Sequence, residues 1–153
     1  MSAPSPRGPR ARPLATVGAL LVDPDGRVLL IRTPKWRNRW GVPGGKIEYG
    51  EIMAAALCRE VREETGLELD TVHWAPVQEA VESPEFHRPA HFVLLNFVAR
   101  TPGGSVRLND EADTYAWVTP QQALAMDLNH PTEVLVRHFQ RHGFRTPALE
   151  EHG

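Results

Sequence analysis

The segment at residues 44–67, GGKIEYGEIMAAALCREVREETGL, decides how this chain folds and where its chemistry lies. Within it, Glu60, Glu63 and Glu64 follow the i, i+3, i+4 spacing that places side chains on one face of a helix. Carboxylates packed together repel one another, and such oxygen ligands suit a hard cation such as Mg²⁺. The segment therefore predicts a helix that presents metal-binding acids. The alternative is an ordinary solvated, charged helix face.

The opposite side of the predicted helix is apolar. Small and apolar side chains recur at i, i+3, i+4, i+7 and i+11, which is typical of a face buried against a sheet. These residues are Ala54, Leu57, Cys58, Val61 and Thr65. Gly50 and Glu51 are predicted to open the helix, and Gly66 is predicted to end it in the left-handed conformation. Just upstream, Gly44 and Gly45 allow a close backbone approach, so that carbonyl oxygens join the carboxylates.

The segment resembles the Nudix box, G-x5-E-x7-R-E-U-x-E-E-x-G-U, in which U is a bulky aliphatic residue. Every fixed position is filled, by Gly45, Glu51, Arg59, Glu60, Val61, Glu63, Glu64, Gly66 and Leu67. Residues 40–45, WGVPGG, are also similar to the W-x-x-P-G-G stretch that commonly leads into the box. The resemblance implies the Nudix fold, an α/β (α+β) architecture in which a mixed β-sheet lies between α-helices.

The resemblance also implies roles for the acids of the box. Glu60 and Glu64, one helical turn apart, are the expected principal metal ligands, together with the carbonyl oxygen of Gly44 or Gly45. Glu51 is expected to complete the metal shell.

Two further roles depend on the family pattern. Glu63 is expected to share a metal ion or to act as the general base, because the base differs among family members, and Arg59 is expected to orient Glu63. In the family, an acid about six residues before a strand tryptophan often reaches the metal site from a mobile loop. Glu111 stands in that position before Trp117. The alternative for Glu111 is a solvated acidic loop.

The residues upstream of the box predict a hairpin and then a loop with substrate-binding character. Residues 15–22 and 27–32 read as antiparallel strands joined by a turn at residues 23–26. The following stretch, TPKWRNRWGVPGG, is basic and aromatic, a composition that suits base stacking and phosphate neutralisation. The candidate substrate-binding residues are Arg32, Trp36, Arg37 and Arg39. Trp40 is interpreted as a structural plug beside the glycine turn.

Downstream of the box, the pattern alternates between strands and loops. Residues 68–79 are predicted to form one long strand, residues 90–99 a central strand and residues 115–118 a short strand. His87 and His91 are interpreted as loop or pocket residues. Thr119 and Pro120 mark a helix start, and a terminal helix is expected from residue 131, with His138 and His142 facing solvent.

Length and composition predict one domain at residues 14–147, with a disordered tail at 1–13 and a C-terminal tail at 148–153. The net charge of −2 argues against stable nucleic-acid binding. The single cysteine, Cys58, excludes an internal disulfide and fits a reducing compartment. Neither a secretory signal nor a run of about 18 apolar residues is found, which favours a cytoplasmic protein without a membrane span. Analogy with the family suggests a homodimer.

Charge repulsion indicates the reaction that such a site performs. A pyrophosphate linkage repels both hydroxide and carboxylates, and divalent cations, Mg²⁺ or alternatively Mn²⁺, remove both problems. The expected reaction is attack of water on a phosphorus of a nucleoside diphosphate derivative, with release of the nucleoside monophosphate (NMP). The derivative is a nucleoside triphosphate, a nucleoside diphosphate or a nucleotide sugar.

Several alternatives stay open at this point. Known substrate markers for ADP-ribose, dinucleoside polyphosphate and coenzyme A hydrolases are incomplete, although the first two classes are kept as alternatives. A non-enzymatic sensor of nucleotide metabolites is a further alternative. An isomerase of prenyl diphosphates would want a nucleophilic cysteine in the pocket, whereas Cys58 is predicted to face the core.

Overall fold

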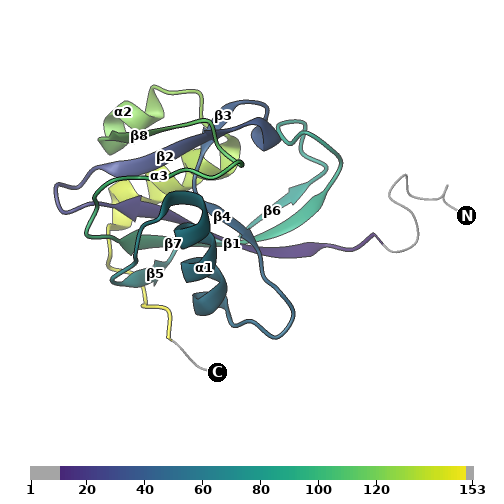
Figure 1. Cartoon of the computed structure of the whole chain (residues 1–153), viewed down its shortest axis with the longest axis horizontal. Coiled ribbons are helices and arrows are strands. Elements are labelled where there is room, and N and C mark those ends of the chain that lie inside the picture. Colours follow the sequence, from purple (N-terminus) through teal and green to yellow (C-terminus); the bar gives the residue numbers. More distant parts are fainter. Residues whose placement is uncertain (1–10, 151–153) are drawn as a thin grey trace, which may run out of the picture.

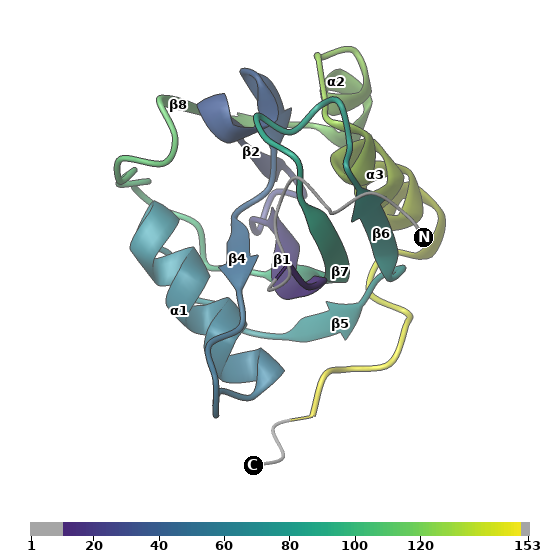
Figure 2. The same ribbon diagram turned by 90° about the vertical axis from the view of Figure 1, so that its right-hand side faces the viewer.

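The computed structural model describes residues 11–150, which form one eight-stranded mixed sheet with helices on both faces (Figures 1 and 2). The strands are β1 (Leu14–Val22), β2 (Val28–Thr33), β3 (Arg39–Gly41), β4 (Gly44–Lys46), β5 (Val72–Trp74), β6 (Gln78–Val81), β7 (His91–Arg100) and β8 (Thr114–Val118). The helices are α1 (Met53–Thr65), α2 (Pro120–Leu124), α3 (His130–His142) and a short 3₁₀ helix, η1 (Pro34–Trp36).

The sheet is built around β1 and β7, which run parallel to one another along their full length, from Leu14 opposite Phe92 to Val22 opposite Arg100. β2 and β4 pair antiparallel with β1, and β8 pairs antiparallel with β2. The predicted hairpin of β1 and β2 and the central position of β7 are thereby confirmed. β1 and β7 are strongly apolar because each contributes side chains to a core on either face of the sheet.

Alternate residues of the central strands supply two separate cores. Val17, Ala19 and Leu21 face α1 together with Phe97, whereas Leu20 packs with the core beneath α3. Figure 2 shows α1 and α3 on opposite sides of β1, β4 and β7. This alternation of side chains follows from the two-residue period of a strand. On one of the two faces, the acidic helix α1 packs directly against β4.

The prediction of one long strand at residues 68–79 is wrong. Two short strands, β5 and β6, pair with different parts of β7 instead. Pro76 separates them, because a proline has no backbone N–H for the ladder. The gap is bridged by Asn96 of β7, whose side-chain amide donates to the Pro76 carbonyl at 3.1 Å and whose carbonyl accepts from the Ala75 N–H at 2.9 Å.

The start of α1 also differs from the prediction. The helix begins at Met53, with Ile52 as its N-cap, and not at Gly50 and Glu51. The Glu51 carboxylate is instead turned back to the Glu48 N–H at 2.9 Å and to Arg59. The predicted end is confirmed, since Gly66 adopts a φ of 74° and donates its N–H to the Arg62 carbonyl.

The C-terminal part of the chain is more ordered than the sequence suggested. Thr119 caps α2, as predicted, and also forms a capping box with Gln122, whereas Asn129 caps α3 one residue earlier than expected. His138 is half-buried rather than solvent-facing, and its Nε2 atom is buried. Burial, and to a smaller extent the charge of the neighbouring His142, lowers the pKa of His138.

Beyond α3, Leu149 donates its N–H to the Val72 carbonyl at 2.8 Å. Pairing with β5 therefore continues past residue 147, the predicted domain boundary.

Two sequence-based predictions concern segments outside this description in whole or in part. The tail predicted at residues 1–13 lies mostly outside the described residues, as do residues 151–153. Among the described helices, none has the length and apolar character needed to cross a membrane.

Candidate active site

Three carboxylates converge where α1 faces β4. Glu60 and Glu64 come from α1 and Glu111 from the loop before β8, and one oxygen of each lies within 4.8 Å of the others. Glu60 and Glu64 are 9% and 6% exposed. Carboxylate oxygens in this number and proximity suit a hard divalent cation. The donor set of the described residues thus fits the metal ion expected from the sequence.

Glycines at β4 make room for these buried acids. A Cβ atom on Gly45 would lie 2.5 Å from the Glu60 carboxyl carbon, and the Gly44 N–H donates to Glu64 Oε2 at 2.7 Å. Gly44 also lies against the backbone of β1, its antiparallel neighbour, where a Cβ would clash. Both predicted glycines are therefore beside the acids, and each is required by close packing.

Electrostatics oppose full ionisation of the cluster. Burial, reinforced by the charge of Glu111, raises the pKa of Glu64 to about 9. Burial also raises the pKa of Glu60, although hydrogen bonds from Arg59 act against that change. For Glu111, burial acts to raise the pKa, but the hydrogen bond from Lys35 contributes to a net lowering. A cation among these oxygens would favour the ionised forms of all three.

This electrostatic arrangement predicts that stabilisation by Mg²⁺ increases with pH. Glu64 has a folded-state pKa of about 9 against an ordinary value of 4.5, so its contribution to stability is full below 4.5 and is lost as pH rises through 9. A bound cation offsets that loss, because its ligands must be deprotonated. We expect the increase in Tm caused by Mg²⁺ to be larger near pH 8 than near pH 5. Equal increases at both pH values, measured by scanning calorimetry, would contradict this prediction.

Arg59 organises the other side of the cluster. Its guanidinium donates to both Glu51 oxygens at 2.7 and 2.9 Å, to Glu60 at 2.9 Å and to the Lys46 carbonyl at 3.0 Å. The hydrogen bonds from Arg59, followed by that of the Glu48 N–H, hold the pKa of Glu51 at about 2. Glu63, which Arg59 was expected to orient, accepts only a longer bond of 3.4 Å. Arg59 therefore chiefly fixes Glu51 and Glu60.

Two of the predicted acids are placed differently from the others. The Glu51 carboxylate forms a salt bridge with Arg59 and is not among the three converging carboxylates. The structure therefore does not bring Glu51 into the expected metal shell. Glu63 has a side chain that is 56% exposed. Glu60 and Glu64 turn toward the glycines of β4, whereas Glu63 lies toward solvent and keeps its bond with Arg59.

The forked hydrogen bonds of Arg59 predict that folding stability is sensitive to substitution of this residue. Lysine has the same charge but lacks the planar fork that holds Glu51 with two bonds and still reaches Lys46. We expect Arg59→Lys to lower the free energy of unfolding by about 1.5–3 kcal/mol, the range for hydrogen bonds to charged groups. Arg62→Lys, at an exposed pair with Glu68, is the matched control and should change stability clearly less than Arg59→Lys does. Urea unfolding checks both, and equal losses would contradict this role of Arg59.

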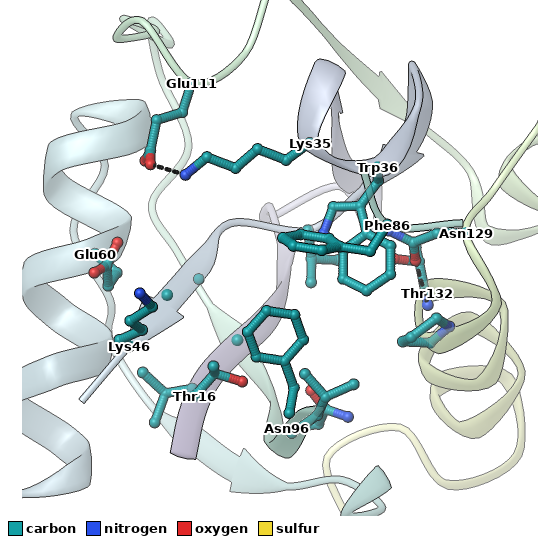
Figure 3. A pocket seen from close by; sticks show the side chains of 18 of the residues that line it. Thr16, Lys35, Trp36, Lys46, Glu60, Phe86, Asn96, Glu111, Asn129 and Thr132 are labelled. Atoms are coloured by element: carbon teal, nitrogen blue, oxygen red, sulfur yellow. Dashed lines mark hydrogen bonds and ion pairs between the residues drawn. The ribbon is translucent and has the colours of Figure 1, made fainter. Parts of the chain in front are cut away.

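A cavity of about 490 Å³ extends from the acids to α3 (Figure 3). Glu60 and Glu111 line one end, and Asn129 and Thr132 line the other. Between them stands an aromatic wall, in which Trp36 contacts Phe86 with ring centroids 4.9 Å apart. The cavity therefore offers an acidic end and an apolar end with amide groups, which together suit a phosphorylated, ring-containing ligand.

The structure brings only one of the four predicted substrate-binding residues to this cavity. Trp36 lines it. Arg32 instead pairs with Asp113 at 3.2 Å, Arg37 donates to the Pro84 carbonyl at 2.8 Å, and Arg39 faces Glu85 at 3.5 Å. These arginines hold neighbouring loops together. Trp40 packs in the core beneath α3, which agrees with its interpretation as a structural plug.

Several residues that the sequence analysis missed or only partly identified also line the cavity. Lys35, Lys46 and Arg88 supply the positive charge, and Asn96 and Asn129 supply amides. His87 lines the cavity, whereas His91 does not. Lys35 lay in the basic loop that the sequence singled out, but Asn96 is a polar residue inside an otherwise apolar strand. That irregularity in residues 90–99 was the available signal.

Comparisons with known proteins agree with this site. A family model described as NUDIX domain matches residues 12–139. Nucleoside triphosphatase NudI of Escherichia coli K12 is 29% identical over 132 residues, which cover 80% of this chain and 94% of that protein. The crystal structure of a MutT NUDIX hydrolase from Burkholderia pseudomallei has a TM-score of 0.71 at 28% identity and covers 83% of this chain and 98% of the other.

A further solved structure extends the likeness in fold alone. A NUDIX hydrolase from Nitrosomonas europaea has a TM-score of 0.73 at 21% identity, covering 92% of this chain and 98% of that one. The family match spans both the acidic helix and the strands that hold it. The likeness therefore covers the whole cavity and extends well beyond the box at residues 45–67.

Proposed function

Because the chain belongs to the NUDIX domain family, and is thus a hydrolase acting on phosphorus-containing anhydrides, we propose that it hydrolyses nucleoside triphosphates to NMP and pyrophosphate. The family and the mixed α/β fold expected from the sequence are confirmed. The substrate class is the new element of the proposal. It rests on the cavity that joins Glu60 and Glu111, two of the three converging carboxylates, to an aromatic, amide-bearing end.

The size and lining of the cavity support a nucleotide of this kind. A volume of about 490 Å³ lies within the range of small-molecule sites. Trp36 and Phe86, which pack edge to face, give an apolar aromatic wall for a base, and the acids at the opposite end mark the position of the phosphates. The named relative, a nucleoside triphosphatase, supports the choice of triphosphates over nucleoside diphosphates or nucleotide sugars.

Each acid has a proposed role. Glu60, Glu64 and Glu111 would hold Mg²⁺, or Mn²⁺ as an alternative, together with a carbonyl oxygen of Gly44 or Gly45. Such an ion would shield the phosphate charge and acidify a water molecule. Glu63 keeps its proposed role as general base or as ligand of a further ion, acting from the exposed side of α1. Glu51 is proposed to support the site through Arg59 and not as a direct ligand.

The experiment that tests this proposal is a hydrolysis screen. Purified protein is incubated with nucleoside di- and triphosphates, nucleotide sugars, ADP-ribose and dinucleoside polyphosphates, with Mg²⁺ or Mn²⁺, and products are identified by mass spectrometry. We expect triphosphates to give NMP at the highest rate. Preferred turnover of ADP-ribose or a dinucleoside polyphosphate would overturn the substrate assignment while leaving the metal site intact. Tight binding without turnover of any compound would favour a nucleotide sensor.

A further inference from the structure

Lys35 stands where the acidic end of the cavity meets its aromatic end. It lies in η1 beside Trp36, and its ammonium group forms an ion pair with Glu111, one of the three converging carboxylates (Figure 3). Both side chains line the cavity and both retain access to solvent. The ion pair therefore connects the basic loop at residues 33–39 with the loop that carries Glu111.

The backbone of Lys35 is held on both sides. Its N–H donates to Thr33 Oγ1 at 3.0 Å, and its carbonyl accepts from the His87 N–H at 2.8 Å. Next to it, Trp36 packs edge-on against Phe86. The Lys35 side chain is thus restrained at both ends, by its fixed backbone and by the ion pair of its ammonium group with Glu111. It therefore loses less conformational entropy when a ligand binds.

Glu111 is held in a similar way from the other side. Its N–H donates to Asn109 Oδ1 at 3.0 Å. Two residues on, the Asp113 N–H donates to the Arg32 carbonyl at 3.1 Å, and the Asp113 carboxylate pairs with the Arg32 guanidinium. Arg32, which the sequence suggested as a substrate contact, thus anchors the Glu111 loop to β2 instead.

We propose that Lys35 is a substrate-binding residue that contacts the polyphosphate and links it to Glu111. An ammonium group has three N–H donors and no acceptor. Glu111 uses one donor, which leaves two for phosphate oxygens in the cavity. The inference rests on the proposed function, since it takes the cavity to hold a polyphosphate. The competing interpretation is that Lys35 is only a counter-ion that offsets repulsion among the acids.

The test uses inorganic tripolyphosphate, which has no base, together with Mg²⁺ and calorimetric titration. Lys35→Met removes the charge and keeps the length of the side chain. We expect its Kd for tripolyphosphate to rise about 10- to 100-fold, the range for a lost hydrogen bond to a charged group. Lys35→Arg, which restores the charge, should stay within about fivefold of the wild-type protein.

Arg37→Met is the matched control, because it removes one positive charge from the same loop at a residue that does not line the cavity. Its Kd should be unchanged. The inference is overturned if Arg37→Met weakens binding as much as Lys35→Met, because the effect would then be general attraction by charge. It is also overturned if Lys35→Met binds tripolyphosphate normally and only its Mn²⁺ affinity changes, as a counter-ion role requires.

The binding measurement separates this inference from the proposed function. Tripolyphosphate binding that depends on Lys35 would support the inference even if the hydrolysis screen found no nucleoside triphosphatase activity. Absence of tripolyphosphate binding by the wild-type protein would overturn the inference even if the screen succeeded. In active protein, the same substitution should raise KM for the triphosphate about as much as Kd, with kcat changed less than about threefold.

Discussion

Replacing Glu64 by glutamine is expected to lower turnover at least about 100-fold, the scale for loss of a main charge-stabilising group. Glu64 is nearly buried, bonded to the Gly44 N–H at 2.7 Å and adjacent to Glu60 and Glu111. The amide keeps the size of the carboxyl group and still accepts from Gly44, but it cannot supply the charge that a divalent cation needs. Steady-state kinetics at saturating Mg²⁺ measures the effect.

The same substitution should leave the metal-free fold intact. With a pKa of about 9, Glu64 is protonated at neutral pH in the metal-free protein, so a neutral amide replaces a neutral carboxyl group. The free energy of unfolding in EDTA should therefore be equal to or higher than that of the wild-type protein. Glu68→Gln, at an exposed pair with Arg62, is the matched control and should keep full activity. Near-normal turnover of the Glu64 variant would remove Glu64 from the mechanism.

Gly45→Ala is expected to lower turnover about 10- to 100-fold by displacing Glu60. The added methyl group would meet the Glu60 carboxyl group at 2.5–2.6 Å. This clash is with the end of a side chain, not with backbone, so the carboxylate moves and the strand pairing of β4 survives. Mn²⁺ affinity, measured by electron paramagnetic resonance, should fall in parallel with turnover.

A double-mutant cycle provides the control for Gly45→Ala. If the methyl group acts through Glu60, then adding it to a Glu60→Gln protein should have little further effect on turnover, so the two changes are strongly non-additive. Independent, multiplicative losses would show that Gly45 acts by another route. An alanine at Gly44 would not serve as a comparison, because its Cβ would strike the backbone of β1.

The sequence identified those features that local spacing controls. The box at residues 45–67 fixed the family, the helix end at Gly66 and the pairing of acids with a glycine turn. The hairpin and the start of α2 also follow from short patterns, a turn between apolar runs and a threonine followed by proline. Glu111 was found only through the family pattern, because a loop acid has no periodicity of its own.

Long-range contacts explain what the sequence missed. Arg32, Arg37 and Arg39 are cations in a promising loop, yet each finds an acid or a carbonyl from a distant segment. The exposure of Glu63 depends on how α1 is rotated about its axis where it packs against β4, because Glu60 and Glu64 fill the space beside the glycines. The break between β5 and β6 depends on Asn96, a residue some twenty positions downstream. The homodimer and the cytoplasmic location stay predictions.

The most direct test of this account is the identity of the products formed from a nucleoside triphosphate in ¹⁸O-labelled water. Wild-type protein with Mg²⁺ should release NMP and pyrophosphate in equal amounts, with one labelled oxygen in one of the two products. EDTA should abolish the release, and Glu64→Gln should lower it at least about 100-fold. Formation of the nucleoside diphosphate and orthophosphate, or release that persists in EDTA, would contradict the account. The labelled product would also identify which phosphorus the water attacks.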